Sequence, residues 1–424
     1  MRGLRLILVL LVLLGGSFPI LLQSGPALLI THGPASGDVT ATEAVIWARA
    51  NGAATMEVEF GTDPQLTEAQ AAEPLPVDEG TDFTGKVFLK RLEPGTRYYY
   101  RVRFSQAGVA SEPLQGSFTT APAPEEPGNV TFIWSADLGG QNFCRQPEYS
   151  IFRTMSGFGA DFFLFLGDTI YADESCPSPP NEPGSAFAAT TLEGYRAKHR
   201  YNLADPPVRE FFQERPVYAI WDDHEVTDNF SGPFEPLMPL GRRAFLEYYP
   251  IAPDPEDPTR LYRSFRWGRE LELFILDTRQ YRSRNTDPDG PQKTMLGREQ
   301  LEWLKQGLQG SDATWKIIIS TVPLSVPSRG QAQDSWANGR SRTGFERELL
   351  EIVDFILTDE IRNVVWLTGD VHFPQAISYD PDRDGTPDFY EFTSGPLSAL
   401  PGTPRPWDRT LNPQSLYIDS GFFN

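Results

Sequence analysis

Residues 162–171 read FFLFLGDTIY, an apolar run of five residues followed directly by Gly167 and Asp168. A short run that is apolar throughout predicts a strand buried on both faces, as in a parallel sheet. Runs of the same kind recur between residues 131 and 370, and helical segments lie between them. This alternation predicts an α/β domain.

Acidic residues follow directly after several of the expected strands, which are residues 131–136, 162–166, 217–221, 272–276, 316–320 and 363–368. In an open α/β sheet, ligands bind outside the carboxyl ends of the strands, so we expect these acidic side chains to converge. Carboxylates that share one pocket raise each other's pKa unless cations neutralise them, which predicts a metal cluster. The acids and histidines at these strand ends are Asp137, Asp168, Asp222, Asp223, His224, Asp370 and His372.

Two segments have the apolar spacing of three and four that is typical of amphipathic helices. They are residues 296–308 and 345–357, and both are expected to pack on a sheet. His199 lies in a highly charged segment and is expected on the surface.

The first part of the chain has a different pattern. Residues 28–120 alternate between apolar and polar or run apolar between turns, which predicts a small all-β domain. Residues 92–102, LEPGTRYYYRV, resemble the turn-and-strand signature of fibronectin type III domains, and their tyrosines are expected in its core. The proline-rich residues 121–128 are expected to link it to the α/β domain at residues 129–424.

The formal net charge is −20 for 424 residues. This charge repels a polyphosphate backbone, so nucleic acid is not expected as a partner, and no protein partner is indicated. Residues 1–24 place two arginines before an aliphatic run, which predicts a signal peptide and export, or alternatively an uncleaved membrane anchor. Cys144 and Cys176 form either one disulfide or two free thiols.

Four ordered motifs resemble those of the alkaline phosphatase D family of calcineurin-like metallophosphoesterases: SAD at 135–137, GDTIY at 167–171, WDDHE at 221–225 and GDVH at 369–372. Further segments resemble other signatures of the family, so the resemblance covers nearly the whole chain. It implies a calcineurin-like α/β sandwich behind a fibronectin type III-like domain, and a metal-dependent phosphoesterase with a phosphate-ester substrate.

The resemblance also implies two metal sites. A first metal would be bound by Asp137, Asp168, Tyr171 and His372. A phenolate beside carboxylates suits Fe³⁺, and the Gly-Asp-x-x-Tyr motif resembles that of purple acid phosphatases, although alkaline phosphatase D members often carry cysteine in place of Asp137. The second site would use only oxygen ligands, which suit Ca²⁺, with Mn²⁺ or Mg²⁺ as alternatives. Its ligands would be the bridging Asp168 with Asp223 and Asp370.

Such a metal pair activates water for in-line attack on a phosphoryl group. His224 is expected to be the general acid, and Asp222 either orients it or is structural. Glu225 is expected to be structural. Arg279 is expected either to contact the substrate phosphate or to pair with a carboxylate.

The substrate stays open between phosphomonoesters and phosphodiesters, including phospholipase D-type cleavage. A function of a different class is also open, namely an inactive, calcium-dependent surface or adhesion protein. Intact ligand residues at every metal position favour the enzyme.

Residues 380–391, DPDRDGTPDFYE, match the spacing of a calcium-binding loop. The segments on either side are expected to be strands, whereas helices flank such loops in EF-hands. The segment is therefore either a structural calcium loop or an acidic hairpin without an ion. The expected ligands are Asp380, Asp382, Asp384, Thr386, Asp388 and Glu391.

Overall fold

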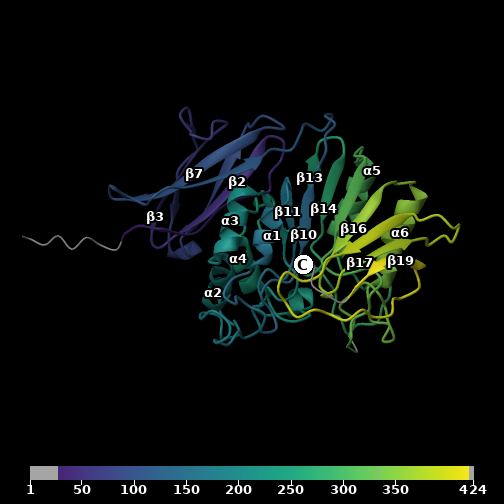
Figure 1. The fold of residues 1–424 in the computed structure, drawn as a ribbon. Coiled ribbons are helices and arrows are strands. Elements are labelled where there is room, and N and C mark those ends of the chain that lie inside the picture. The colour runs from purple at the N-terminus through teal and green to yellow at the C-terminus, as the bar shows by residue number, and fades with distance from the viewer. Residues whose placement is uncertain (1–26, 331, 420–424) are drawn as a thin grey trace, which may run out of the picture.

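The computed structural model describes residues 27–330 and 332–419. Two sheets pack face to face in the centre, and side chains from both form one continuous apolar core. Helices α1 to α4 cover the outer face of one sheet, whereas α5 and α6 cover the outer face of the other (Figure 1). This α/β sandwich, preceded by an all-β region, is the predicted fold class.

The first central sheet has three parallel strands from the α/β region and three strands from the N-terminal region. Their order is β10 (Phe132–Ser135), β11 (Phe162–Leu166), β12 (Val217–Ile220), β1 (Ile30–Gly37), β2 (Glu43–Ala50) and β6 (Thr84–Lys90). The parallel pairing of β1 with β12 joins the two regions at Gly37 and Val217. A Cβ atom on Gly37 would lie 2.5 Å from the carbonyl oxygen of Val217, so the two backbones approach too closely for a side chain. The sequence did not predict this continuous sheet.

The remaining N-terminal strands form a separate antiparallel sheet. They are β3 (Ala54–Gly61), β4 (Gln70–Ala71), β5 (Leu75–Val77), β7 (Arg97–Gln106), β8 (Val109–Ala110) and β9 (Leu114–Thr119), and a short 3-10 helix, η1 (Glu79–Thr81), precedes β6. Tyr98 and Tyr100 on β7 are buried in the core, as expected from their period-two spacing, whereas Tyr99 between them is less buried.

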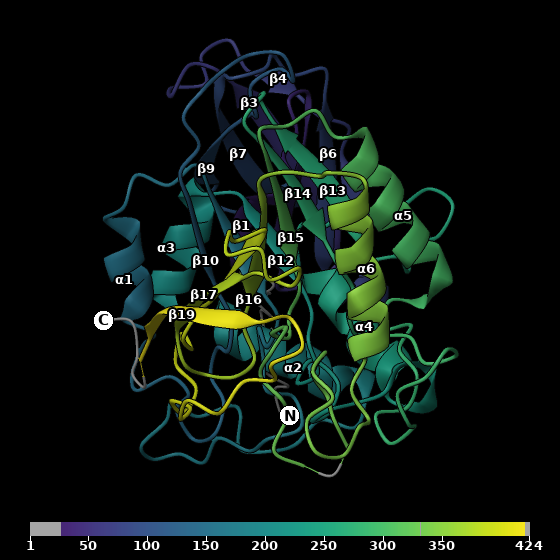
Figure 2. The same ribbon diagram turned by 90° about the vertical axis from the view of Figure 1, so that its right-hand side faces the viewer.

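The second central sheet contains four parallel strands at its centre. Its order is β13 (Arg263–Trp267), β14 (Leu271–Ile275), β15 (Trp315–Ile319), β16 (Val364–Thr368), β18 (Phe389–Thr393), β17 (Gln375–Tyr379) and β19 (Pro413–Ile418). Figure 2 shows α5 and α6 lying over this sheet, with β19 at its edge.

The two predicted helices are confirmed as α5 (Gly297–Gly310) and α6 (Glu346–Thr358), but the other helices were not predicted. These are α1 (Ile151–Ser156), α2 (Leu192–Leu203), α3 (Pro206–Glu214), α4 (Met238–Tyr248) and the 3-10 helix η2 (Gly232–Phe234). Helix α2 buries Arg196, Lys198 and His199, so its buried face does not look apolar in the sequence.

The expectation that His199 lies on the surface is wrong. Its ring is fully buried and stacks on that of Tyr248 with a centroid separation of 5.2 Å, because α2 packs against α4. The predicted signal peptide or anchor, residues 1–24, lies outside the described residues. Among the residues that the structure describes, no helix is both long and apolar enough to cross a membrane.

Candidate metal centre

The segments that follow β10, β11, β12 and β16 converge at one edge of the two central sheets. Four residues there have left-handed backbone conformations: Asp137 (φ 65°), Asp168 (φ 48°), Asp370 (φ 67°) and His372 (φ 61°). Such conformations are unfavourable for residues other than glycine and concentrate at functional sites. The backbone turns sharply at the end of each strand, and this edge brings together the predicted site residues.

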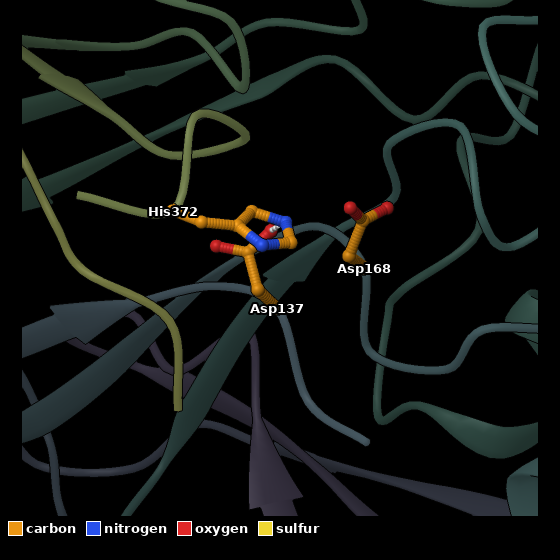
Figure 3. Close-up of side chains that lie close together, drawn as sticks. All are labelled: Asp137, Asp168 and His372. Atoms are coloured by element: carbon orange, nitrogen blue, oxygen red, sulfur yellow. Dashed lines mark ion pairs between the residues drawn. The ribbon is translucent and has the colours of Figure 1, made fainter. Parts of the chain in front are cut away.

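Asp137, Asp168 and His372 form one group whose ligand atoms all lie within 4.8 Å of one another (Figure 3). His372 Nε2 is 3.3 Å from Asp137 Oδ1 and 2.9 Å from the hydroxyl of Tyr171. The other ring nitrogen, Nδ1, lies 2.7 Å from the carbonyl oxygen of Leu400, an acceptor that requires the proton on Nδ1. The lone pair of neutral His372 is therefore on Nε2, directed at the group.

A second group shares Asp168 and adds Asp223 and His224, and a third contains Asp222, Asp223 and Asp370. Burial and the neighbouring carboxylates raise the pKa of Asp168 well above its usual value, and the same causes raise that of Asp370. Both shifts have the direction expected when carboxylates share a buried site without a compensating cation.

The donor atoms fit metal ions. Neither carboxylate oxygen of Asp137 accepts a hydrogen bond within the described part of the chain, and Asp223 Oδ1 likewise accepts none, although all three atoms are buried. Buried carboxylate oxygens without hydrogen-bond partners are costly unless a cation satisfies them. Burial alone lowers the pKa of His372, but the charge of Asp137 raises it to about 9. In the absence of a metal ion, a proton on His372 therefore supplies the positive charge beside Asp137.

Asp173, which the sequence analysis did not single out, holds His224. Its Oδ1 atom lies 2.7 Å from His224 Nδ1, and the ring of Tyr171 stacks on the imidazole at a centroid separation of 4.1 Å. Burial lowers the pKa of His224, but the charge of Asp223 and the hydrogen bond to Asp173 raise it to about 10. The available signal was an acid two residues after Tyr171, at the start of a long loop.

Asp222 does not orient His224. Its oxygens accept hydrogen bonds from Arg279 Nε at 2.6 Å and Arg279 Nη2 at 2.8 Å, and a further one from the hydroxyl of Thr321. Arg279 is fully buried and also pairs with Asp334 at 2.6 Å, so it neutralises carboxylates and does not reach a substrate. Of the two alternatives for Arg279, pairing with a carboxylate is the one observed.

Glu225 has the structural position expected of it. Its carboxylate accepts hydrogen bonds from the backbone nitrogens of Asp168 at 3.2 Å, Thr169 at 2.6 Å and Asp222 at 2.8 Å. It therefore ties the loop after β11 to the loop after β12. Gly167, directly before Asp168, has φ 91°, and a Cβ atom on Gly167 would lie 2.4 Å from the Cβ atom of Asp222.

The acidic segment after β17 forms a hairpin with β18. Asp380, Asp382 and Asp388 bring carboxylate oxygens within 4.8 Å of one another, whereas Asp384 accepts a hydrogen bond from the backbone of Thr386. The expectation that Glu391 is a ligand of this loop is wrong, because its side chain is fully buried in the sheet. It accepts hydrogen bonds from Tyr379, Thr368 and the backbone of Leu324.

Cys144 and Cys176 are joined in a disulfide with a Cα–Cα distance of 6.3 Å, which decides between the two alternatives for this pair. The bond links the loop after β10 to the loop after β11, and both of these loops carry residues of the metal centre.

A cavity of about 870 Å³ opens directly over the carboxylates and imidazoles of the metal centre. Asp168, Asp223, Asp370, His224 and His372 all line it. The cavity is within the size range of small-molecule sites. The carboxylates and the two imidazoles are therefore accessible to a ligand.

Comparison with known proteins identifies the family. The family model described as PhoD-like phosphatase matches residues 132–415, and that of its N-terminal domain matches residues 23–122. Alkaline phosphatase D of Bacillus subtilis is 28% identical over 399 residues, which are 84% of this chain and 66% of that protein; the chain thus spans just under two thirds of its length.

Two solved structures agree with the fold. A structure of PhoD matches with a TM-score of 0.72 and 25% identity over 87% of this chain and 77% of that chain. A purple acid phosphatase from seeds of yellow lupin (Lupinus luteus) matches with a TM-score of 0.62 and 15% identity over 93% of this chain and 69% of that chain. The family models cover most of the sequence, and the chain therefore belongs to the PhoD-like phosphatase family.

Proposed function

We propose that this protein is an exported, metal-dependent phosphoester hydrolase. The observation that carries the proposal is the carboxylate cluster around Asp168, which has buried oxygens without hydrogen-bond partners and lies beneath an open cavity. The family membership supports the same activity. The apolar N-terminal sequence supports export.

Asp137, Asp168, Tyr171 and His372 would hold Fe³⁺, and Asp168, Asp223 and Asp370 would hold Ca²⁺. Ions at these positions, when bound, draw charge from the phosphoryl oxygens and supply hydroxide near neutral pH. The Tyr171 hydroxyl supports the ferric assignment, since it lies 2.9 Å from His372 Nε2 and phenolate is a hard oxygen donor. Elemental analysis of the native protein tests this, and a stoichiometric zinc pair without iron would contradict it.

His224 is the proposed general acid. The carboxylate of Asp173 accepts a hydrogen bond from His224 Nδ1, which leaves Nε2 to donate a proton to the leaving oxygen of the ester. Stacking on Tyr171 sets the plane of the ring. Both the proton donor and its orientation thus come from side chains of this chain.

The activity is tested by hydrolysis of an aryl phosphodiester and an aryl phosphomonoester by calcium-supplemented protein, with Asp168→Asn as the comparison. We expect turnover by the wild type and a loss of at least about 10³-fold in kcat/KM in the variant. The reason is that Asp168→Asn removes several kcal/mol of charge stabilisation from the transition state. A folded, metal-loaded wild type that hydrolyses neither ester would favour the binding protein over the enzyme.

A further inference from the structure

Three arginines, Arg284, Arg329 and Arg405, line the cavity above the metal centre. Within the described part of the chain none of them forms an ion pair, in contrast to the buried Arg279 and Arg282, which pair with Asp334. The cavity therefore has acids in its floor and guanidinium groups without carboxylate partners in its wall.

Arg405 is held by a loop that is built onto the metal centre. In this loop the carbonyl of Leu400 accepts the hydrogen bond of His372 Nδ1, and Gly402 N donates to the carbonyl of His372 at 2.6 Å. A Cβ atom on Gly402 would lie 2.2 Å from the carbonyl oxygen of Val371, so only glycine allows this contact. The loop is thus packed directly against the segment that carries Asp370 and His372.

The same loop is restrained beyond Arg405. Prolines stand on both sides, at Pro404 and Pro406, and limit the backbone conformations of the arginine. Next along the chain, Trp407 Nε1 donates to Gln375 Oε1 at 3.0 Å, and Asp408 N donates to the carbonyl of Ser325 at 2.8 Å. Arg405 is therefore presented to the cavity by a braced segment.

The surroundings of Arg405 show that it lacks a partner. Its Nε atom is buried and has no hydrogen-bond acceptor in the described structure. Asp370 and Arg329 line the same cavity as Arg405. Burial lowers the pKa of Arg405, the charge of Asp370 raises it and the charge of Arg329 lowers it. A partly buried guanidinium with an unsatisfied N–H and a second arginine in the same cavity is stabilised when an anion enters.

We propose that Arg405, supported by Arg329, binds a second anionic group of the substrate, beyond the phosphate that is hydrolysed. The scissile phosphate would lie at the carboxylate floor, at the proposed metal ligands, and a cavity of about 870 Å³ is far larger than one phosphate. Arg329 is exposed at the cavity and extends the positive surface outward. The substrate class is therefore a phosphate ester with an additional phosphate, phosphonate or carboxylate; this inference rests on the proposed function.

The test compares two 4-nitrophenyl phosphodiesters whose second arm ends either in a phosphonate (2-phosphonoethyl) or in a hydroxyl (2-hydroxyethyl). We expect the wild type to prefer the phosphonate arm in kcat/KM. Arg405→Ala should lower kcat/KM for the phosphonate arm about 10-fold to 100-fold more than for the hydroxyl arm, mainly through KM, because a charge-assisted bidentate contact is lost. Arg405→Lys should retain part of the preference, and Arg329→Ala should reduce it less.

Arg409→Ala is the matched control, because Arg409 is exposed and its guanidinium donates to the carbonyl of Pro413. It should leave the ratio between the two diesters unchanged. Melting temperatures identify a variant that fails to fold, in which case Arg405→Gln replaces Arg405→Ala. An unchanged ratio, or an equal loss for both diesters, would overturn the anion subsite, whereas no hydrolysis of either diester by the wild type would contradict the proposed function instead.

Discussion

Asp222 and Asp223 are neighbours in the sequence and both are buried, yet the structure gives them opposite surroundings. Both oxygens of Asp222 are bound by Arg279. Asp223 Oδ1 accepts no hydrogen bond from any described residue and lies 3.5 Å from Arg279 Nη2, while Asp223 Oδ2 accepts a hydrogen bond from the backbone of Asn229 at 2.6 Å.

The difference extends to the two regions around them. On the side of Asp222, Arg279 and Arg282 neutralise Asp334 as well. On the side of Asp223, the carboxylates of Asp137 and Asp168 lie close together, and neither pairs with an arginine of residues 27–330 or 332–419. A buried carboxylate thus serves structure where the protein supplies the cation and is a candidate metal ligand where it does not.

The largest expected effect comes from Asp223→Asn. Removing a ligand of the proposed second metal should lower kcat/KM for an aryl phosphodiester by about 10³-fold. Stability of the metal-free protein, measured by urea denaturation, should change far less than in an Arg279 variant, because the attraction of Asp223 to Arg279 and His224 is lost together with its repulsion of the neighbouring carboxylates. A marked loss of stability in the metal-free Asp223→Asn variant would contradict the contrast between a structural Asp222 and a metal-binding Asp223.

Arg279→Met should show the reverse pattern, with stability as the main loss. Leaving Asp222 buried without its cation, and Asp334 with Arg282 alone, should cost about 3–5 kcal/mol in the free energy of unfolding. Arg153→Met is the control, since Arg153 forms an exposed pair with Glu148 and should have a far smaller effect. Equal stability losses in the two variants would show that the Arg279 network is not essential to the fold.

Asp173→Asn sharpens the assignment of His224. The hydrogen bond to Asp173 raises the pKa of His224 against the lowering effect of burial, so its loss should lower that pKa. Because a general acid must be protonated, the alkaline limb of the pH–rate profile should move to lower pH, with a decrease of about tenfold in kcat. Asp228→Asn, 4.0 Å from Nε2, should move the limb less; equal movement would count against the specific role of Asp173.

The smallest effect is expected at the acidic hairpin, which we propose binds a structural Ca²⁺. A site at 100 times its Kd adds about 2.7 kcal/mol, and we expect Ca²⁺ to raise the melting temperature by a few degrees, about 2–4 °C. Asp382→Asn together with Asp388→Asn should remove that part of the shift, whereas Asp354→Asn on the surface of α6 should not. The same calcium shift in the double variant and the wild type would rule out the loop.

Much of the fold could be predicted because its signals are local. The apolar run 162–166 specifies a strand by its own composition, and the helix at 297–310 follows from apolar spacing. The acids after the strands follow from the same pattern, since parallel strands place their carboxyl ends at one edge. Helix α2 escaped prediction because its buried residues Lys198 and His199 are polar. Lys198 donates to the carbonyls of Glu174 and Ser185, and the His199 ring stacks on Tyr248 of α4, contacts that the sequence does not reveal.

The sequence by itself determined where the buried strands lie along the chain, which motifs of the family are present, and the candidate ligands Asp137, Asp168 and His372. Only the tertiary structure decided which acids have a cation of their own, because Arg279 lies 57 residues from Asp222 along the chain. It also decided that Asp173 orients His224 and that Arg405 faces the cavity. Hydrogen bonds and burial depend on residues far apart in sequence, so the chemical role of a side chain is settled only when those residues meet.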